Sequence, residues 1–428
     1  MPDLDLDTEL GRLRDGIRQS VPVPDFDRVL ERSRQRVVRG RMQIAAAAAV
    51  LLVSVAVPLL RAGMAPDPVE PATPPAPATP SQQMMPTEPF IFDGNFADED
   101  HGYAMRADCD EGPAPQDCAE ILLATDDGGD RWTTRALPKP ENLPNGALGR
   151  LWVLGEDEVA VDWNGSLAAQ ARRVHSTDGG QTWHPVEVPL VVTDTVPAIP
   201  DGGVLVVGCP KLVGVGWQCD ETGVDVVLPG SGEPARLANP PRLDEPQPGP
   251  ITTRDGRWWV VGRQPGTRQW AAAVSDDEGR TWVISPLGFA GTPAQEGWSV
   301  VSAGDTLYAS AVGMQIADRY GMLAVLRSDD GGRSWERTWQ WDEDAMPRDT
   351  LGQPVGLPDG SLMINAKGGK GRTFVSEDGG RTFTEVKRRY NGGAFWTRAG
   401  YAAWPADMPN DKFQFSADGE HWRDMTIK

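Results

Sequence analysis

Six short segments of this chain follow one pattern, S/T-x-D-x-G-x-x-W, with Phe replacing Trp in the fifth and a shortened form in the sixth. Each segment is preceded by a β-type run, such as EILLA or WAAAV, and followed by another short run. Two such runs around a Gly-containing turn predict a β-hairpin. A fold built by repeating this hairpin is therefore expected. The segments are 125–132, 176–183, 275–282, 328–335, 376–383 and 416–422.

The residue types of the pattern have a direct structural interpretation. The Asp carboxylate is suited to accept backbone N–H bonds in a tight turn, and the Gly supplies a positive φ. The first Ser or Thr bonds locally, and the terminal aromatic residue packs back as an apolar plug. These tasks assign the Asp residues to the fold and not to catalysis. They are Asp127, Asp178, Asp277, Asp330, Asp378 and Asp418.

The spacing of these Asp residues predicts the number of units. The successive steps are 51, 99, 53, 48 and 40 residues, so one unit lacks the signature. Midway through the long step, two apolar runs flank Pro229–Gly232, which predicts the same hairpin with a different turn. A second turn, such as 358–360, precedes most segments and makes four strands per unit. Seven units across 90–428 predict an all-β fold, a seven-bladed β-propeller.

Residues 42–62 predict a transmembrane helix. No charge occurs from Ile44 to Leu60, a stretch of 17 residues that is near the lower limit for spanning a bilayer. Arginines crowd the stretch just before it, which places the N-terminus in the cytoplasm and the propeller outside the cell membrane. A cleaved signal peptide is the alternative, because Gly63 and Ala65 resemble a cleavage site. A leader of 41 residues is long for such a signal.

The segments on either side of this helix differ in character. Residues 1–41 hold nine Arg and eight Asp or Glu, with apolar residues at helical spacing, and predict either a docking helix for a cytoplasmic partner or a solvated stalk. Residues 63–89 are Pro-rich, with nine Pro from Ala65 to Pro89, and predict a disordered, extended linker.

Composition excludes several classes of function. The net charge of −20 opposes nucleic-acid binding, which needs clustered positive charge. The four Cys have no metal-ligand spacing and the four His form no cluster, so we expect no metal and no cofactor. Known catalytic signatures, such as G-x-S-x-G and H-E-x-x-H, are absent.

The six segments resemble the bacterial neuraminidase repeat, or Asp box, which occurs in sialidases, sortilin-type receptors and photosystem assembly factors. The resemblance covers residues 90–428. It implies a β-propeller in which the box lies between the third and fourth strands of a blade and faces away from the ligand. Sialidases also carry an Arg-Ile-Pro motif, whereas the nearest string here is Ala198-Ile199-Pro200. The chain is therefore expected not to be a sialidase.

Propeller geometry places the longer loops, between second and third strands, on the face opposite the boxes. Several of these loops are basic or aromatic, and Arg forks suit carboxylate or phosphate groups. Surface exposure without a ligand, or packing between blades, is the alternative for each residue. The candidate ligand-binding residues are Trp163, Arg263, Arg268, Trp270, Arg319, Tyr320, Lys370 and Arg372.

The cysteines bracket two of these loops. Cys109 and Cys118 flank one loop, and Cys209 and Cys219 flank another. Outside the membrane both pairs are expected to be disulfides.

Three functions follow from this organisation. The first is a membrane-anchored propeller that binds a protein or a cell-envelope glycan. The second is a glycoside hydrolase, sialidase-like, acting on the same face. The third is a transmembrane sensor whose residues 1–41 contact a cytoplasmic regulator.

Overall fold

The computed structural model describes residues 89–109, 118–140, 148–163, 172–189, 191–213, 218–249, 253–288, 295–316, 319–342, 345–367, 372–387, 389–390, 392–404 and 412–427. All of these belong to one compact unit, Pro80–Lys428. Their regular structure is entirely β-strand. The predicted cytoplasmic segment, transmembrane helix and most of the linker lie outside the described residues. Within the described part, no helix is long and apolar enough to cross a membrane.

The strands follow one another in groups of four, and the first two groups are antiparallel sheets in sequence order. Each consists of three consecutive hairpins, as the repeat predicts. The first group comprises β1 (Phe90–Phe96), β2 (Gly102–Cys109), β3 (Cys118–Thr125) and β4 (Thr133–Ala136). The second comprises β5 (Arg150–Val153), β6 (Val159–Trp163), β7 (Arg172–Ser176) and β8 (His184–Glu187).

The third group departs from this order. It comprises β9 (Thr195–Val196), β10 (Val204–Val213), β11 (Gln218–Val227) and β12 (Pro234–Leu237). The strands are arranged β10-β11-β12-β9, and β9 runs parallel to β12. The hairpin predicted around Pro229–Gly232 is confirmed, because β11 and β12 pair antiparallel across this turn. The strand that precedes β10 in sequence has therefore moved to the other side of the sheet.

The remaining groups return to sequence order. Two are separate four-stranded sheets, whereas the last two are joined by one parallel contact, Gly352 with Ala394. The separate sheets are β13 (Asp244–Pro248), β14 (Trp258–Arg263), β15 (Trp270–Ser275) and β16 (Val283–Pro286), then β17 (Gln295–Ala303), β18 (Thr306–Ile316), β19 (Arg319–Ser328) and β20 (Glu336–Gln340). The joined groups are β21 (Thr350–Gly356), β22 (Leu362–Ala366), β23 (Arg372–Ser376) and β24 (Thr384–Val386), then β25 (Gly393–Thr397), β26 (Gly400–Trp404), β27 (Lys412–Ser416) and β28 (Arg423–Thr426).

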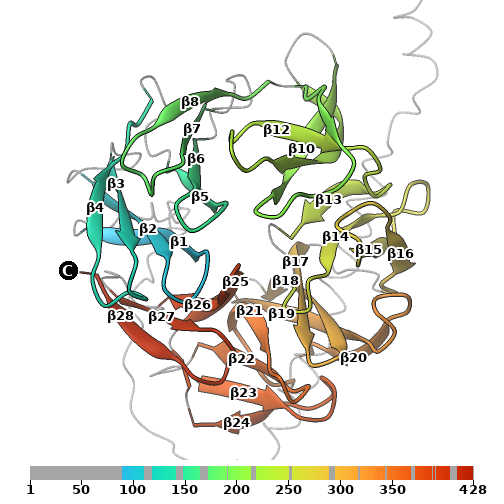
Figure 1. Ribbon diagram of the computed structural model, residues 1–428. Coiled ribbons are helices and arrows are strands. Elements are labelled where there is room, and N and C mark those ends of the chain that lie inside the picture. The colour runs from blue at the N-terminus through green and yellow to red at the C-terminus, as the bar shows by residue number, and fades with distance from the viewer. Residues whose placement is uncertain are drawn as a thin grey trace, which may run out of the picture. The chain divides into compact units, whose positions relative to one another are not determined.

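An apolar cluster fills the space between each group and the next. A further cluster joins the last group to the first, where the ring of Phe96 lies 4.6 Å from that of Phe415. The groups therefore close into a ring, which Figure 1 shows from one end. Stacking the sheets in this way buries both faces of each sheet, as a β-propeller does.

The turns sort onto two faces of the ring. In the first two sheets the box turn is bonded to the turn between the first and second strands, by Gly128 N to Asp100 O and Gly179 N to Asp157 O. We call this end the Asp-box face. The ends of the second strands and the beginnings of the third strands lie at the opposite end of the ring, which we call the loop face.

Candidate functional site

The Asp boxes are closed hydrogen-bond systems. In the box after β19, Ser328 Oγ donates to Asp330 Oδ1 at 2.8 Å, and the N–H of Gly332 donates to Ser328 Oγ at 2.8 Å. Asp330 also accepts the backbone N–H and the hydroxyl of Ser334. These bonds match the turn chemistry predicted from the sequence. They hold the pKa of the Asp carboxyl at about 2.

The same arrangement recurs in the other boxes. Bonds from neighbouring hydroxyl, N–H or Arg groups lower the pKa of each box Asp, so all are carboxylates at neutral pH. Each of these carboxylates is hydrogen-bonded within its own turn, so none of the box Asp residues is placed to act as a general acid or base. The pKa is about 2 for Asp127, Asp178, Asp277 and Asp378, and Asp418 is lowered as well.

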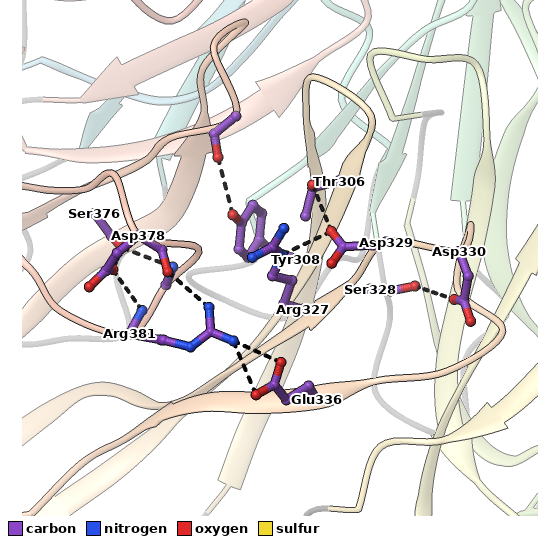
Figure 2. Close-up of polar contacts among 12 residues, drawn as sticks. Thr306, Tyr308, Arg327, Ser328, Asp329, Asp330, Glu336, Ser376, Asp378 and Arg381 are labelled. Carbon is purple, nitrogen blue, oxygen red and sulfur yellow. Dashed lines mark hydrogen bonds and ion pairs between the residues drawn. The ribbon is translucent and has the colours of Figure 1, made fainter.

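The aromatic residue of a box also contacts the preceding sheet. Trp183 Nε1 donates to the carbonyl of Ala136 on β4, and Trp335 Nε1 donates to Ser285 Oγ on β16, both at 2.9 Å. In the box after β23, Arg381 takes a similar part and binds Glu336 of β20 at 2.9 Å (Figure 2). The plug predicted from the sequence is therefore also a polar link between sheets. The Asp-box face serves the assembly of the ring.

The turn that lacks a box Asp is held by its neighbour. Glu158 of the second group accepts the N–H of Gly230 and contacts His175 Nε2 at 2.7 Å. Arg173 donates to the carbonyl of Gly232 at 2.7 Å and is itself paired with the buried Asp162. Contacts from the adjacent sheet thus replace the bonds that an internal Asp supplies elsewhere.

Two of the predicted ligand-binding arginines meet on the loop face. Arg263 Nε and Arg268 Nη2 each lie 2.9 Å from a different oxygen of Glu245. The Arg263 guanidinium also stacks over the ring of Trp270, 4.2 Å from its centroid. We call Glu245, Arg263 and Arg268 the arginine cluster. The two guanidinium groups are thus held together on one carboxylate, the kind of group that Arg side chains bind well.

The backbone of the arginine cluster is unusual. Glu245 and Arg268 both have left-handed conformations, with φ of 50° and 56°. Non-glycine residues adopt this conformation at a cost, and such residues concentrate at functional sites. The side chains of Arg268 and Glu245 are 72% and 54% exposed, so a ligand in solvent reaches both.

The other candidate residues lie elsewhere. Arg372 pairs with Glu385 within its own sheet, which raises the pKa of the guanidinium, and it covers the ring of Phe374 at 5.0 Å. Arg319 and Tyr320 are at the start of β19, but their side chains lie outside the described part of the chain, as does the whole of Lys370.

The two candidate tryptophans are interior residues. Trp163 is 0% exposed, and Trp270 is 5% exposed in the cluster between two sheets. Trp163 Nε1 donates to the buried Glu120, which also accepts the N–H of Gly149. Stacking of these rings on a ligand is not compatible with this burial. We therefore leave both out of the ligand face.

The first cysteine pair is well placed for a bond. Cys109 and Cys118 are directly opposite partners at the ends of β2 and β3. Cys209 lies on β10 and Cys219 on the neighbouring β11. Both disulfides remain predictions.

Two groups in the described residues have the chemistry of metal ligands, Asp98–His101–Glu156 and Asp418–Glu420–His421. In each group the imidazole bonds its own Asp, at 2.9 Å in the first and 2.6 Å in the second. This contact raises the pKa of His101 and of His421.

Sequence reasoning missed Glu245. Its role depends on Arg263 and Arg268, which follow it by about 20 residues, and nothing in the local sequence marks it. It also missed Asp93 on β1, whose carboxylate accepts the N–H of Leu151 on β5 at 2.8 Å. Burial raises the pKa of Asp93 to about 6.

Comparison with known families gives one match. The model described as BNR/Asp-box repeat matches residues 174–185, which span the second box. The chain carries the BNR/Asp-box repeat. A comparison with curated proteins finds no match.

The chain is similar in fold to several solved β-propellers. YCF48 bound to D1 peptide is 17% identical, with 80% of this chain and 82% of that chain covered and a TM-score of 0.32. Hadza microbial sialidase Hz136 is 14% identical, with 79% and 65% covered and a TM-score of 0.37. The β-propeller domain of the Trilobed protease from Pyrococcus furiosus is 10% identical, with 79% and 95% covered and a TM-score of 0.45. At these identities and TM-scores the likenesses carry no argument about the activity of this chain.

Proposed function

We propose that this chain is a membrane-anchored, seven-bladed propeller that stands outside the membrane and binds an anionic group of a protein or cell-envelope glycan on its loop face. The arginine cluster carries this proposal. Glu245 shows that the two guanidinium groups can hold one carboxylate, and all three side chains reach solvent. In a chain with a net charge of −20, two arginines that converge at the surface are a suitable recognition element for an anion.

Binding fits this geometry better than hydrolysis. Most glycoside hydrolases use two carboxyl groups on either side of the scissile bond, at about 5–10 Å from each other, whereas sialidases use a Tyr nucleophile with acidic partners. The arginine cluster contains a single carboxylate, Glu245, with an arginine on each oxygen. The box Asp residues are committed to their turns on the other face.

A binding assay on the full chain tests the proposal. The chain, in detergent micelles, is applied to arrays of acidic glycans and acidic peptides, together with the double variant Arg263→Ala, Arg268→Ala. Loss of each charged contact should weaken binding by about tenfold or more. Arg280→Ala is the matched control, because Arg280 is exposed and pairs with Glu278 on the Asp-box face. Equal binding by wild type and double variant would contradict the proposal.

A further inference from the structure

The two arginines of the arginine cluster belong to one hairpin, which is held by its own bonds. Arg263 ends β14, and its guanidinium lies over the ring of Trp270 at the start of β15, 4.2 Å from the ring centroid. Its Nη1 donates to the carbonyl of Arg268 at 3.0 Å. In the loop between the strands, Gln264 N donates to Gln269 O at 2.8 Å, and Arg268 N donates to Gln264 O at 3.0 Å. The loop and the guanidinium of Arg263 are therefore held in place within this hairpin.

Glu245 comes from another strand and lies in a β-bulge. The register of β13 on β14 shifts between Asp244 and Gln247, so Glu245 has no paired residue opposite it. Bulges re-aim side chains and are frequent beside functional sites. Here the bulge, with a φ of 50° at Glu245, turns the carboxylate onto Arg263 and Arg268. The side chain of Glu245 makes this contact, and the ladder of the sheet does not hold the residue there.

The contact is one that a ligand can replace. The side chains of Glu245 and Arg268 are 54% and 72% exposed, and ion pairs in water are weak. The left-handed backbone of Glu245 is strained, and a change of its φ releases that strain. Arg263 keeps its place over Trp270 when the carboxylate leaves. Displacement of Glu245 is therefore easy and leaves one guanidinium already oriented.

The group that Glu245 imitates is a carboxylate of a protein. One carboxylate serves both arginines, with one oxygen for each. It is a Glu side chain, which is what an acidic residue of another protein offers. The indole under Arg263 is only 5% exposed and is covered by the guanidinium, so it presents no open ring to the face of a sugar.

We propose that Glu245 is an internal stand-in for the ligand, and that an Asp or Glu side chain of a protein partner displaces it and binds the same two guanidinium groups. The displacement concerns the same site and so rests on the proposed function. The partner is an acidic protein segment, and the unliganded site is occupied by the chain's own carboxylate. A ligand that must displace an internal group binds more weakly, in proportion to the fraction of molecules in which the site is open. Removal of the Glu245 carboxylate should therefore strengthen binding.

The variant Glu245→Gln tests the displacement. The full chain in detergent micelles is applied to arrays of acidic peptides and acidic glycans, as wild type and as E245Q. Gln keeps the size of the side chain and removes its charge, which frees the arginines for a ligand. Because two exposed ion pairs are lost, acidic peptides should bind E245Q about threefold to tenfold more tightly than wild type. The gain should disappear when the Asp and Glu residues of a bound peptide are replaced by Asn and Gln.

Two further variants show whether Glu245 acts through the arginines. Asp244→Asn is the matched control, because Asp244 is exposed, precedes Glu245 and loses the same charge. A screened charge in water should change binding by no more than about twofold. In the Arg263→Ala, Arg268→Ala background, Glu245→Gln should give no gain, because the groups that it frees are absent. An equal gain in D244N and E245Q would overturn the displacement, since a general charge effect would then explain both.

The outcomes separate this inference from the proposed function. Binding by E245Q that is equal to or weaker than that of wild type, and is lost in Arg263→Ala, Arg268→Ala, would overturn the displacement and leave the proposed function standing. A gain confined to the acidic glycans would overturn the assignment to a protein partner. Binding that the double Arg variant retains in full would overturn the proposed function and the displacement together.

Discussion

The indole N–H of Trp183 donates to the carbonyl oxygen of Ala136 at 2.9 Å, which links an Asp box to the outer strand of the preceding sheet. Trp282 occupies the same position in another box, but its indole N–H is buried and has no hydrogen-bond partner among the described residues. The difference follows from the fold, because the sheet that precedes Trp282 is the one in which β9 covers β12.

This pair of tryptophans gives a matched test of the link between sheets. Trp183→Phe loses a hydrogen bond and should lower the free energy of unfolding by about 1 kcal/mol more than Trp282→Phe, which loses none. Urea denaturation of the two variants measures the difference. Equal losses would mean that the indole N–H does not link the sheets.

The Asp boxes predict a loss of stability in acid. The pKa of Asp378 is lowered from 3.8 to about 2 in the folded chain, and the other box Asp residues behave alike. A lowered folded-state pKa contributes stability above the unfolded value, and this stability is lost as the pH falls from about 4 to about 2. Denaturant titrations across this range should show the decrease. In Asp378→Asn the free energy of unfolding should decrease less over this pH range than in Glu377→Gln, a control at the exposed neighbouring residue. The same decrease in both variants would contradict the role of the box Asp.

Asp93 should make the free energy of unfolding change with pH in the opposite direction, at higher pH. Burial raises its pKa from 3.8 to about 6, so the folded state holds a proton that the unfolded state releases. Its contribution is therefore favourable below about pH 4 and is lost as the pH rises to about 6. Asp93→Asn should remove this part of the pH dependence in the same titrations. If the free energy of unfolding changes equally with pH in the variant and the wild type between about pH 4 and about pH 6, Asp93 does not cause this pH dependence.

Glu278 predicts a stabilising substitution. It has a φ of 60° at a box position where Gly128, Gly179, Gly331 and Gly379 also have positive φ. Glu278→Gly should raise the free energy of unfolding by up to about 1 kcal/mol, because glycine adopts this conformation without strain. The exposed ion pair with Arg280 that is lost contributes little. Thermal melts measure both effects: Glu278→Gly should raise the melting temperature, and Gly331→Glu, the reverse change in another box, should lower it.

The predicted disulfides are open to direct mapping. Non-reducing digestion and mass spectrometry should recover Cys109 joined to Cys118, and Cys209 joined to Cys219. Closing loops of this length contributes about 2–3 kcal/mol, so reduction should lower the melting temperature. Four free thiols would contradict both pairings.

The repeat made most of the fold predictable because its information is local. A Ser, an Asp and a Gly within five residues, as in 328–332, fix a turn by their own bonds. The hairpin around Pro229–Gly232 was predictable from its apolar runs for the same reason. The displacement of β9 was not, because Thr195 pairs with Arg236, some 40 residues later in the chain.

The site was harder to predict because it depends on contacts between distant residues. Arg263 and Arg268 were recognisable as loop arginines, but their convergence requires Glu245. Trp163 looked like a loop aromatic, yet its ring is buried and bonded to Glu120. Sequence position alone does not tell an aromatic residue at the end of a strand from one on the surface.

The most direct test of the account is a turnover measurement on the full chain with fluorogenic glycosides, including sialosides. Arg263→Ala, Arg268→Ala serves as the site variant and Arg280→Ala as the surface control. We expect no turnover by any of the three proteins, while the wild type still binds acidic ligands. Turnover by the wild type and by Arg280→Ala that is lost in the double variant would show an enzyme at this site and would contradict a binding propeller.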